Sequence, residues 1–260
     1  MEETQANASV DLCVADPTSL RVKNVEFGPE RTLRINSALS TSQEKGLCSL
    51  LKNPLDAFAW SYKEMKGVHS FVYTHHIYIK EDCKPVRQPQ RRMNPTLKDI
   101  FKEELQKLLD AGFIYPISDN EWVFPLVLVP KKNGKWRIYV DYRELNKASK
   151  KDHFPLPFID QMLDGLTMKK FFSFLDGFSR CNQIQINPED QDNTTFTCPW
   201  GTFSYRVLHF GLCNAPSTFQ REVLSIFVEL VHDSVEIYVD DFTLYGSNFQ
   251  EALTNLGKKF

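Results

Sequence analysis

Two hydrophobic patterns interleave along this chain, and together they predict a protein that mixes helices with strands. In the stretch 97–109, apolar residues recur three and four positions apart, which places them on one face of a helix. Runs rich in β-branched and aromatic residues, which favour strands, occur at 171–175 and on both sides of Asp240 and Asp241. The chain therefore alternates between helical and extended segments.

Cap residues indicate where the predicted helices begin and end. Ser40 followed by Gln43 forms a capping box. Asn94 followed by Pro95 provides an N-cap with proline at the first helical position, and Gly112 suits the position just past the end of that helix. Further helices are predicted over 158–166, after 216, and over 248–260.

Strands are predicted between these helices, and a tight turn joins two of them. Residues 25–36 are predicted to form one or two short strands, and further strands are predicted at 77–79, 122–130, 137–142, 183–186 and 194–197. Residues 200–207 are predicted to form a turn followed by a strand. The turn at 131–136 has Asn133 and Gly134 at its tip, a pair typical of β-hairpins. Residues 1–25 are polar and are expected to be mobile.

Three aspartates lie at the ends of predicted strands. Asp240 and Asp241 occupy the bend of a predicted hairpin, and Asp176 ends the strand at 171–175. Aspartate is common in turns because its side chain bonds nearby backbone N–H groups. Three converging carboxylates, however, repel one another unless a cation compensates them. Mg²⁺ suits such oxygen ligands, and two ions ~3.5–4 Å apart support phosphoryl transfer.

Six short stretches in the same order resemble the reverse transcriptase of gypsy-type LTR-retrotransposon polyproteins, most like plant elements. The last of them, Tyr238-Val239-Asp240-Asp241, is similar to the YxDD box of that family. The stretches are 131–137, 140–147, 154–157, 174–179, 210–220 and 238–241. The resemblance covers roughly residue 58 to the C-terminus.

The resemblance implies an α+β fold of the right-hand polymerase type, with a palm of antiparallel sheet and helices, a fingers subdomain and no thumb. The implied domains are a mobile N-terminus and connector over 1–57, an extended connector over 58–94, and fingers and palm over 95–260. The implied activity is RNA-directed DNA synthesis, in which a primer 3′-hydroxyl attacks the α-phosphate of a dNTP. The implied partners are an RNA or DNA template with its primer, dNTPs, and the rest of a retrotransposon polyprotein.

The resemblance also assigns roles to individual residues. Asp176, Asp240 and Asp241 are the implied catalytic and metal-binding residues, acting with two Mg²⁺ ions for which Mn²⁺ can substitute. The implied nucleotide-binding residues are Lys131, Lys132, Arg137, Gly177, Phe178, Cys181 and Phe210. The implied template and primer residues are Arg143, Asn146, Gln220 and Tyr238. For Arg143 the alternative is an ion pair that holds the base of the fingers hairpin.

The chain departs from the family pattern at three places. Arg180-Cys181 replaces the usual Gly-Tyr, whose aromatic ring excludes a ribose 2′-hydroxyl, and His209 replaces a usual proline. The resemblance stops soon after the hairpin, before any thumb, RNase H or integrase. The alternative is therefore a fragment or degenerate copy that is catalytically inert and at most binds nucleic acid. An RNA-dependent RNA polymerase is disfavoured because the fingers stretches match the retroelement pattern.

Charge and cysteine content add little to this picture. The net charge is −2, but 131–151 is locally basic, which suits phosphates or an ordinary solvated surface. The six cysteines lack metal-site spacing and are expected to be free thiols, and His75-His76 is expected to be strand surface. The basic stretch 84–92 is expected to be a linker or a template contact. With no signal peptide or membrane-length apolar run, the expected location is intracellular, in a cytoplasmic particle or the nucleus.

Overall fold

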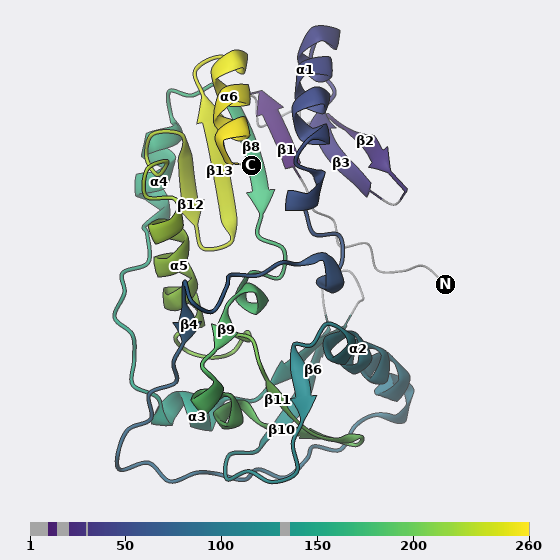
Figure 1. Ribbon diagram of the computed structural model, residues 1–260, viewed down its shortest axis with the longest axis vertical. Helices are drawn as coiled ribbons and strands as arrows, with labels where there is room; N and C mark the ends of the chain where they lie inside the picture. The colour runs from purple at the N-terminus through teal and green to yellow at the C-terminus, as the bar shows by residue number, and fades with distance from the viewer. Residues whose placement is uncertain (1–9, 15–20, 30, 131–135, 260) are drawn as a thin grey trace. The chain divides into compact units, whose positions relative to one another are not determined.

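The computed structural model describes residues 10–14, 21–29, 31–130 and 136–259 (Figure 1). The chain forms two compact units, each made of segments that are separate in sequence. The first unit comprises Met1–Met65, Pro155–Phe178 and Gln220–Phe260, and the second comprises Lys66–Phe154 and Ser179–Phe219. Helix α5, Ala215–Ile226, begins in the second unit and ends in the first.

The first unit is built on a six-stranded sheet in the order β12-β13-β8-β1-β3-β2. All neighbouring strands are antiparallel except β1 and β3, which are parallel. The strands are β1 Val10–Val14, β2 Val22–Gly28, β3 Arg31–Asn36, β8 Phe171–Asp176, β12 Val235–Tyr238 and β13 Asp241–Gly246. The helices are α1 Thr41–Lys52, α4 Ile159–Leu166 and α6 Phe249–Lys259, with 3-10 turns η1 Leu55–Ala57 and η2 Tyr62–Glu64.

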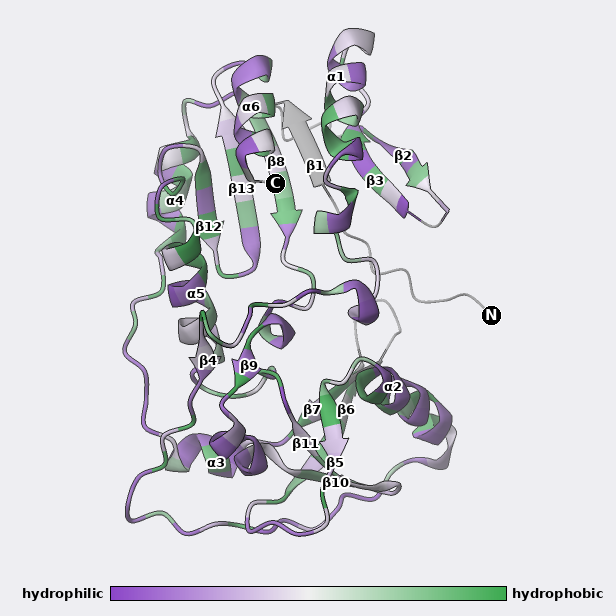
Figure 2. Ribbon diagram, in the orientation of Figure 1, coloured by the Kyte–Doolittle hydropathy of each residue, from purple (hydrophilic) through white to green (hydrophobic). Residues whose placement is uncertain are grey.

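Alternation along β8 explains how this sheet is buried. Ser173 and Leu175 are buried, whereas Phe174 and Asp176 on the opposite face are exposed, as the two-residue period of a strand requires. Helix α6 packs against β13 and β8. Figure 2 shows hydrophobic residues along most of β8 and mainly hydrophilic ones on α2 of the second unit. The hydrophobic core of the first unit therefore lies between its sheet and its helices.

The N-terminal region differs from the mobile stretch that was expected. Residues Val10–Val14 form β1, which pairs with β8, and β2 already begins at Val22. The partners of β1 in β8 lie about 160 residues further along the chain, as in the pair Val10↔Leu175. A five-residue run gives little local signal, and this pairing is a long-range contact that a local pattern cannot reveal.

The second unit contains a five-stranded sheet in the order β5-β11-β10-β6-β7 and a two-stranded parallel pair, β4 and β9. The strands are β4 Thr74–His75, β5 Ile114–Pro116, β6 Phe124–Pro130, β7 Trp136–Val140, β9 Gln185–Ile186, β10 Phe196–Cys198 and β11 Gly201–Tyr205. The helices are η3 Pro95–Leu97, α2 Lys98–Asp110, α3 Arg143–Ala148, η4 Arg180–Gln183 and η5 Pro188–Thr194.

Both predicted caps are confirmed, and one face assignment is wrong. Ser40 and Gln43 form the reciprocal capping box of α1. The Asn94 side chain accepts from the backbone N–H of Thr96, and Gly112 has φ +72° just past the end of α2, a conformation that favours glycine. Ile100, placed on the buried face of α2 by its spacing, is 44% exposed.

Three predicted strands and one predicted surface are corrected in this unit. The strand expected at 77–79 lies earlier, at β4, and 183–186 and 194–197 each begin in a 3-10 turn before a short strand. His75, expected at the strand surface, is 3% exposed and shares a 2.9 Å hydrogen bond with the Thr218 hydroxyl. Two- and three-residue strands carry too little periodicity to be located from sequence. None of the helices in the described part of the chain is long and apolar enough to cross a membrane.

Candidate active site

The predicted Asp-Asp hairpin is confirmed, and its turn is strained. Strands β12 and β13 pair up to Tyr238↔Asp241, which leaves Val239 and Asp240 as a two-residue loop. Val239 has φ +55°, and a positive φ at the first loop residue is the pattern of a type II′ turn. Because a β-branched residue rarely adopts this conformation, the turn stores about 1–3 kcal/mol of strain.

Gln220 in α5 holds this turn in place. Its Oε1 accepts from the Val239 backbone N–H at 2.9 Å, and its Nε2 donates to the Ile237 carbonyl at 3.3 Å. The Gln220 side chain is 0% exposed. The resemblance implies a template or primer contact for Gln220, and that contact stays a prediction. In the structure both ends of its amide bond the hairpin backbone, so Gln220 positions the residues that flank the aspartates.

The three aspartates lie together at one end of the sheet. Asp241 in β13 is directly opposite Asp176 in β8, a spacing of ~4.5–5.5 Å between Cβ atoms. The Gly177 N–H donates to the Asp240 carbonyl at 2.9 Å, which joins the end of β8 to the turn. Asp176 and Asp241 are exposed, and like charges directly opposite each other destabilise a sheet.

This arrangement suits a hard cation in its donor type. Carboxylate oxygens are the ligands that Mg²⁺ prefers, and a cation would relieve the repulsion between Asp176 and Asp241. The described residues nevertheless contain no group of three or more His, Cys, Asp or Glu side chains gathered closely enough to hold a metal ion. The structure thus brings the aspartates to neighbouring backbone positions, and their roles as metal ligands stay predictions.

Two other predicted residues flank the aspartates in the first unit. Phe178 packs its ring against Tyr62, with ring centroids 5.8 Å apart. Tyr238 is half-buried at the end of β12. Their predicted contacts with a nucleotide and with template or primer stay predictions.

A second group of predicted residues lies in the second unit, where Asn146 fixes the loop that carries Phe210. The Asn146 Nδ2 donates to the Gly211 carbonyl at 2.6 Å, and its Oδ1 accepts from the Cys213 N–H at 2.8 Å. Gly211 has φ +103°, a conformation that favours glycine. Asn146, predicted to contact template, therefore has a structural role as the clamp of this loop.

Phe210 and the η4 segment meet at the surface of the second unit. Phe210 is 39% exposed, and the Arg180 guanidinium lies over its ring, 5.1 Å from the centroid. Cys181, predicted to contact the nucleotide sugar, is only 2% exposed. A direct contact between Cys181 and a nucleotide therefore requires η4 to move, and that assignment stays a prediction.

His209, just before Phe210, is buried among aromatic rings. Its ring centroid lies 4.3 Å from that of Tyr205 and 6.1 Å from that of Tyr142. Its Nδ1 has no hydrogen-bond partner among the described residues. Burial lowers the pKa of His209 to about 4, because a charged imidazolium loses its hydration in the core. The sequence showed His209 only as a departure from the family pattern.

The base of the fingers hairpin is held by an ion pair, one of the two roles considered for Arg143. Its Nε and Nη2 donate to the two Asp141 carboxylate oxygens, both at 2.7 Å. Arg91 also pairs with Asp141. The hydrogen bonds from Arg143 lower the pKa of Asp141. In the strand before it, Arg137 pairs with Val129 across β7 and β6. Lys131, Lys132 and the rest of the stretch 131–135 lie outside the described residues.

Comparison with known proteins agrees with this geometry. A sequence model of the family described as Reverse transcriptase (RNA-dependent DNA polymerase) matches residues 129–260, about half of the chain. The chain belongs to the reverse transcriptase family. The retrovirus-related Pol polyprotein from transposon 412 of Drosophila melanogaster is 31% identical over 237 residues, which are 86% of this chain and 19% of that polyprotein.

Solved reverse transcriptases share the fold. A crystal structure of the prototype foamy virus protease-reverse transcriptase has a TM-score of 0.75 and 27% identity, covering 85% of this chain and 29% of that one. The foamy viral protease-reverse transcriptase in complex with an RNA/DNA hybrid has a TM-score of 0.73 and 22% identity over the same shares. The predicted mixed fold of a polymerase palm and fingers is confirmed. The chain spans less than a third of each of these relatives.

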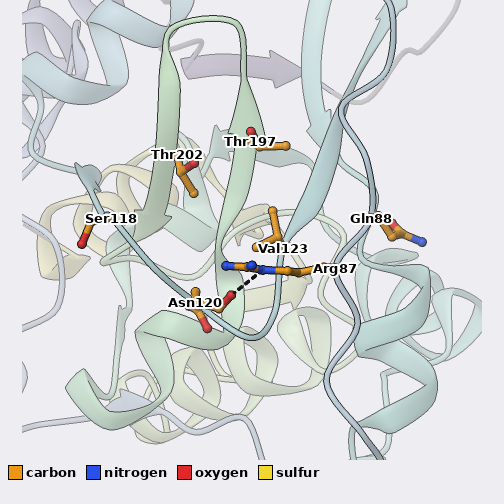
Figure 3. A pocket seen from close by; sticks show the side chains of 7 residues that line it. All are labelled: Arg87, Gln88, Ser118, Asn120, Val123, Thr197 and Thr202. Carbon is orange, nitrogen blue, oxygen red and sulfur yellow. Dashed lines mark hydrogen bonds between the residues drawn. The ribbon is translucent and has the colours of Figure 1, made fainter.

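The second unit of this chain also has a small polar cavity that the sequence did not indicate. It has a volume of about 200 Å³ and is lined by Arg87, Gln88, Ser118, Asn120, Val123, Thr197 and Thr202. Figure 3 shows Arg87 reaching across it to the Asn120 carbonyl, to which its Nε donates at 3.0 Å. Arg87 also pairs with Asp119. None of the lining residues is a predicted site residue. The bonds from Arg87 to Asn120 and Asp119 hold part of the basic stretch 84–92 in place.

Proposed function

We propose that this chain is the polymerase part of a gypsy-type, plant-like LTR-retrotransposon polyprotein and carries out RNA-directed DNA synthesis. The observation that carries the proposal is the placement of Asp176 opposite Asp241, with Asp240 in a turn tied down by Gln220. Strand register and the hairpin turn bring the backbone positions of these three acids to the same end of the sheet. The family match supports the reaction type.

In this proposal Asp176 and Asp240 hold two divalent cations, Mg²⁺ or Mn²⁺, and Asp241 supports them. Bound cations of this kind lower the pKa of an attacking hydroxyl and stabilise a leaving oxygen. The contribution of the protein is to hold the acids in place. Sheet register fixes Asp176 against Asp241, and the bond from the Gly177 N–H to the Asp240 carbonyl fixes the turn against β8.

The proposed partners are a primer annealed to an RNA or DNA template, and dNTPs. The foamy viral relative was solved with an RNA/DNA hybrid, which supports a nucleic-acid partner of this type. In the second unit, Arg143 and Lys147 on α3 are exposed, with side chains 76% and 72% accessible. Cations at such positions attract phosphates and make binding dependent on salt.

Primer extension tests this proposal. The chain is mixed with oligo(dT) annealed to poly(rA), Mg²⁺ and either dTTP or rUTP, alongside the variant Asp240→Asn. Extension with dTTP that is lost in Asp240→Asn supports the proposal. Extension with rUTP alone would indicate an RNA polymerase. If neither nucleotide is added while the folded chain still binds the template-primer, the proposed activity is wrong and the chain is an inert member of its family.

A further inference from the structure

Within η4, Arg180 is the side chain that the fold directs to the surface beside Phe210. The next two residues, Cys181 and Asn182, are 2% and 8% exposed, whereas Arg180 is half-buried. The start of η4 is fixed, because Ser179 has φ +45° and accepts the Asn182 backbone N–H at 2.8 Å and the Asn182 Nδ2 at 2.9 Å. The position of Arg180 is therefore set by the backbone.

Phe210 provides a rigid surface on which the guanidinium rests. The loop after Phe210 is clamped by Asn146 at Gly211 and Cys213, and His209 before it is buried. The Arg180 guanidinium lies 5.1 Å from the centre of the Phe210 ring. Such stacking is favourable but modest for a cation near the surface.

We propose that Arg180 is a polyphosphate-binding residue of the nucleotide site. It rests on Phe210 and donates to the triphosphate of a bound nucleotide. The inference rests on the proposed function, because the family resemblance behind that function assigns Phe210 to the nucleotide site. A guanidinium donates paired hydrogen bonds to phosphate oxygens, and these charge-assisted bonds are stronger than an exposed cation–π contact. The Phe210 ring supports the guanidinium while it donates to a phosphate. Glycine, which the family usually has here, supplies no such group.

Binding of inorganic tripolyphosphate, dTTP and deoxythymidine, measured by titration calorimetry without metal, tests this inference apart from catalysis. Arg180→Ala should weaken tripolyphosphate and dTTP binding about tenfold, which corresponds to about 1.4 kcal/mol, and leave deoxythymidine unaffected. Arg180→Lys, which keeps the charge but not the paired donors, should fall between. The loss should shrink in high salt, because salt screens exposed charges.

Arg206 provides a matched control. Its guanidinium lies 4.5 Å from the centre of the Tyr115 ring in the same unit, so Arg206→Ala removes the same charge and the same kind of contact elsewhere. It should leave tripolyphosphate binding unchanged. Equal weakening in both variants would show a general charge effect and overturn the inference.

The remaining outcomes separate this inference from the proposed function. If Arg180→Ala binds tripolyphosphate as well as or better than the unaltered chain, Arg180 is no ligand and the inference is wrong. If the unaltered chain binds none of the three probes, both the inference and the nucleotide site are wrong. If Arg180→Ala alone loses tripolyphosphate binding, and neither the unaltered chain nor any variant extends a primer, the inference stands and the proposed polymerase activity is wrong.

Discussion

Replacing Gln220 by leucine tests whether the aspartate hairpin depends on a single buried side chain. Gln220 is fully buried and bonds the hairpin backbone at Val239 and Ile237. A leucine side chain is apolar and can stay buried at this position, but it neither donates nor accepts hydrogen bonds. Gln220→Leu therefore removes both bonds while keeping an apolar side chain in the buried position.

The expected cost follows from the two groups that lose their partner. Val239 is half-buried, so losing the hydrogen bond to its N–H costs about 1 kcal/mol, the net contribution of a typical hydrogen bond. Ile237 is 2% exposed, and an unsatisfied buried carbonyl costs about 1–3 kcal/mol. We expect Gln220→Leu to lower the free energy of unfolding by about 2–4 kcal/mol, a large share of the ~5–15 kcal/mol typical of a folded protein.

Urea unfolding followed by circular dichroism measures this cost. Gln161→Leu is the matched control, because Gln161 is exposed on α4 and the same change there should alter stability by less than about 0.5 kcal/mol. A Gln220→Leu chain within about 0.5 kcal/mol of the unaltered one would refute the reasoning. It would mean that the turn holds its strained shape without Gln220.

Gln220→Glu adds a pH signature. A glutamate can still accept from Val239, but it loses the donor to Ile237 and sets an oxygen against that carbonyl. Burial and this repulsion raise its pKa in the folded state above the unfolded value. The carboxyl then binds its proton more tightly when folded, so stability is greatest below the unfolded pKa and is lost as pH rises through the folded pKa. We expect the stability of Gln220→Glu to be closer to that of the unaltered chain at pH 4 than at pH 7. If the difference in stability between the two chains is the same at both pH values, the burial argument is wrong.

The remaining predictions concern the turn, the metal and a buried histidine. Val239→Gly should be more stable in urea than Val239→Ala, reversing the usual order, because only glycine adopts φ +55° without strain. Millimolar Mg²⁺ or Mn²⁺ should raise the melting temperature by ligand linkage, and Asp240→Asn should remove most of the rise; an unchanged melting temperature would argue against the metal site. His209 has a pKa of about 4 in the folded chain, against ~6.5 in the unfolded chain. Lowering the pH from 7 to 5 should therefore reduce the free energy of unfolding by about 2 kcal/mol, because only the unfolded chain takes up the proton in this range. His209→Phe should remove this part of the pH dependence and leave the similar part that the buried His75 contributes, whereas His153→Phe, at an exposed position, should change neither.

Much of the local structure could be predicted from the sequence because its signals lie within a few residues of one another. The capping box of Ser40 and Gln43, the proline after Asn94 and the glycine at 112 each act on a single turn of backbone. The hairpin around Asp240 was predictable for the same reason, because both strands and the turn between them are continuous in the chain.

Only the tertiary structure decided what surrounds the aspartates. Asp176 is more than 60 residues before Asp241, and their pairing is a contact between distant strands. Gln220 and Asn146 looked like nucleic-acid contacts in sequence, yet each satisfies backbone groups of a distant loop. Polar groups removed from water must find partners, but which side chain provides them depends on how distant segments pack.

The departures from the family pattern show the same division. The sequence by itself revealed that Arg180 and Cys181 replace a Gly-Tyr pair, and it pointed to Cys181 as the residue facing the nucleotide. The structure buries Cys181 and places Arg180 over Phe210. The direction of each side chain follows from the left-handed Ser179 and the 3-10 turn after it. Bonds from Asn182 to Ser179 hold this backbone path, but no local sequence pattern requires a non-glycine residue to take a positive φ.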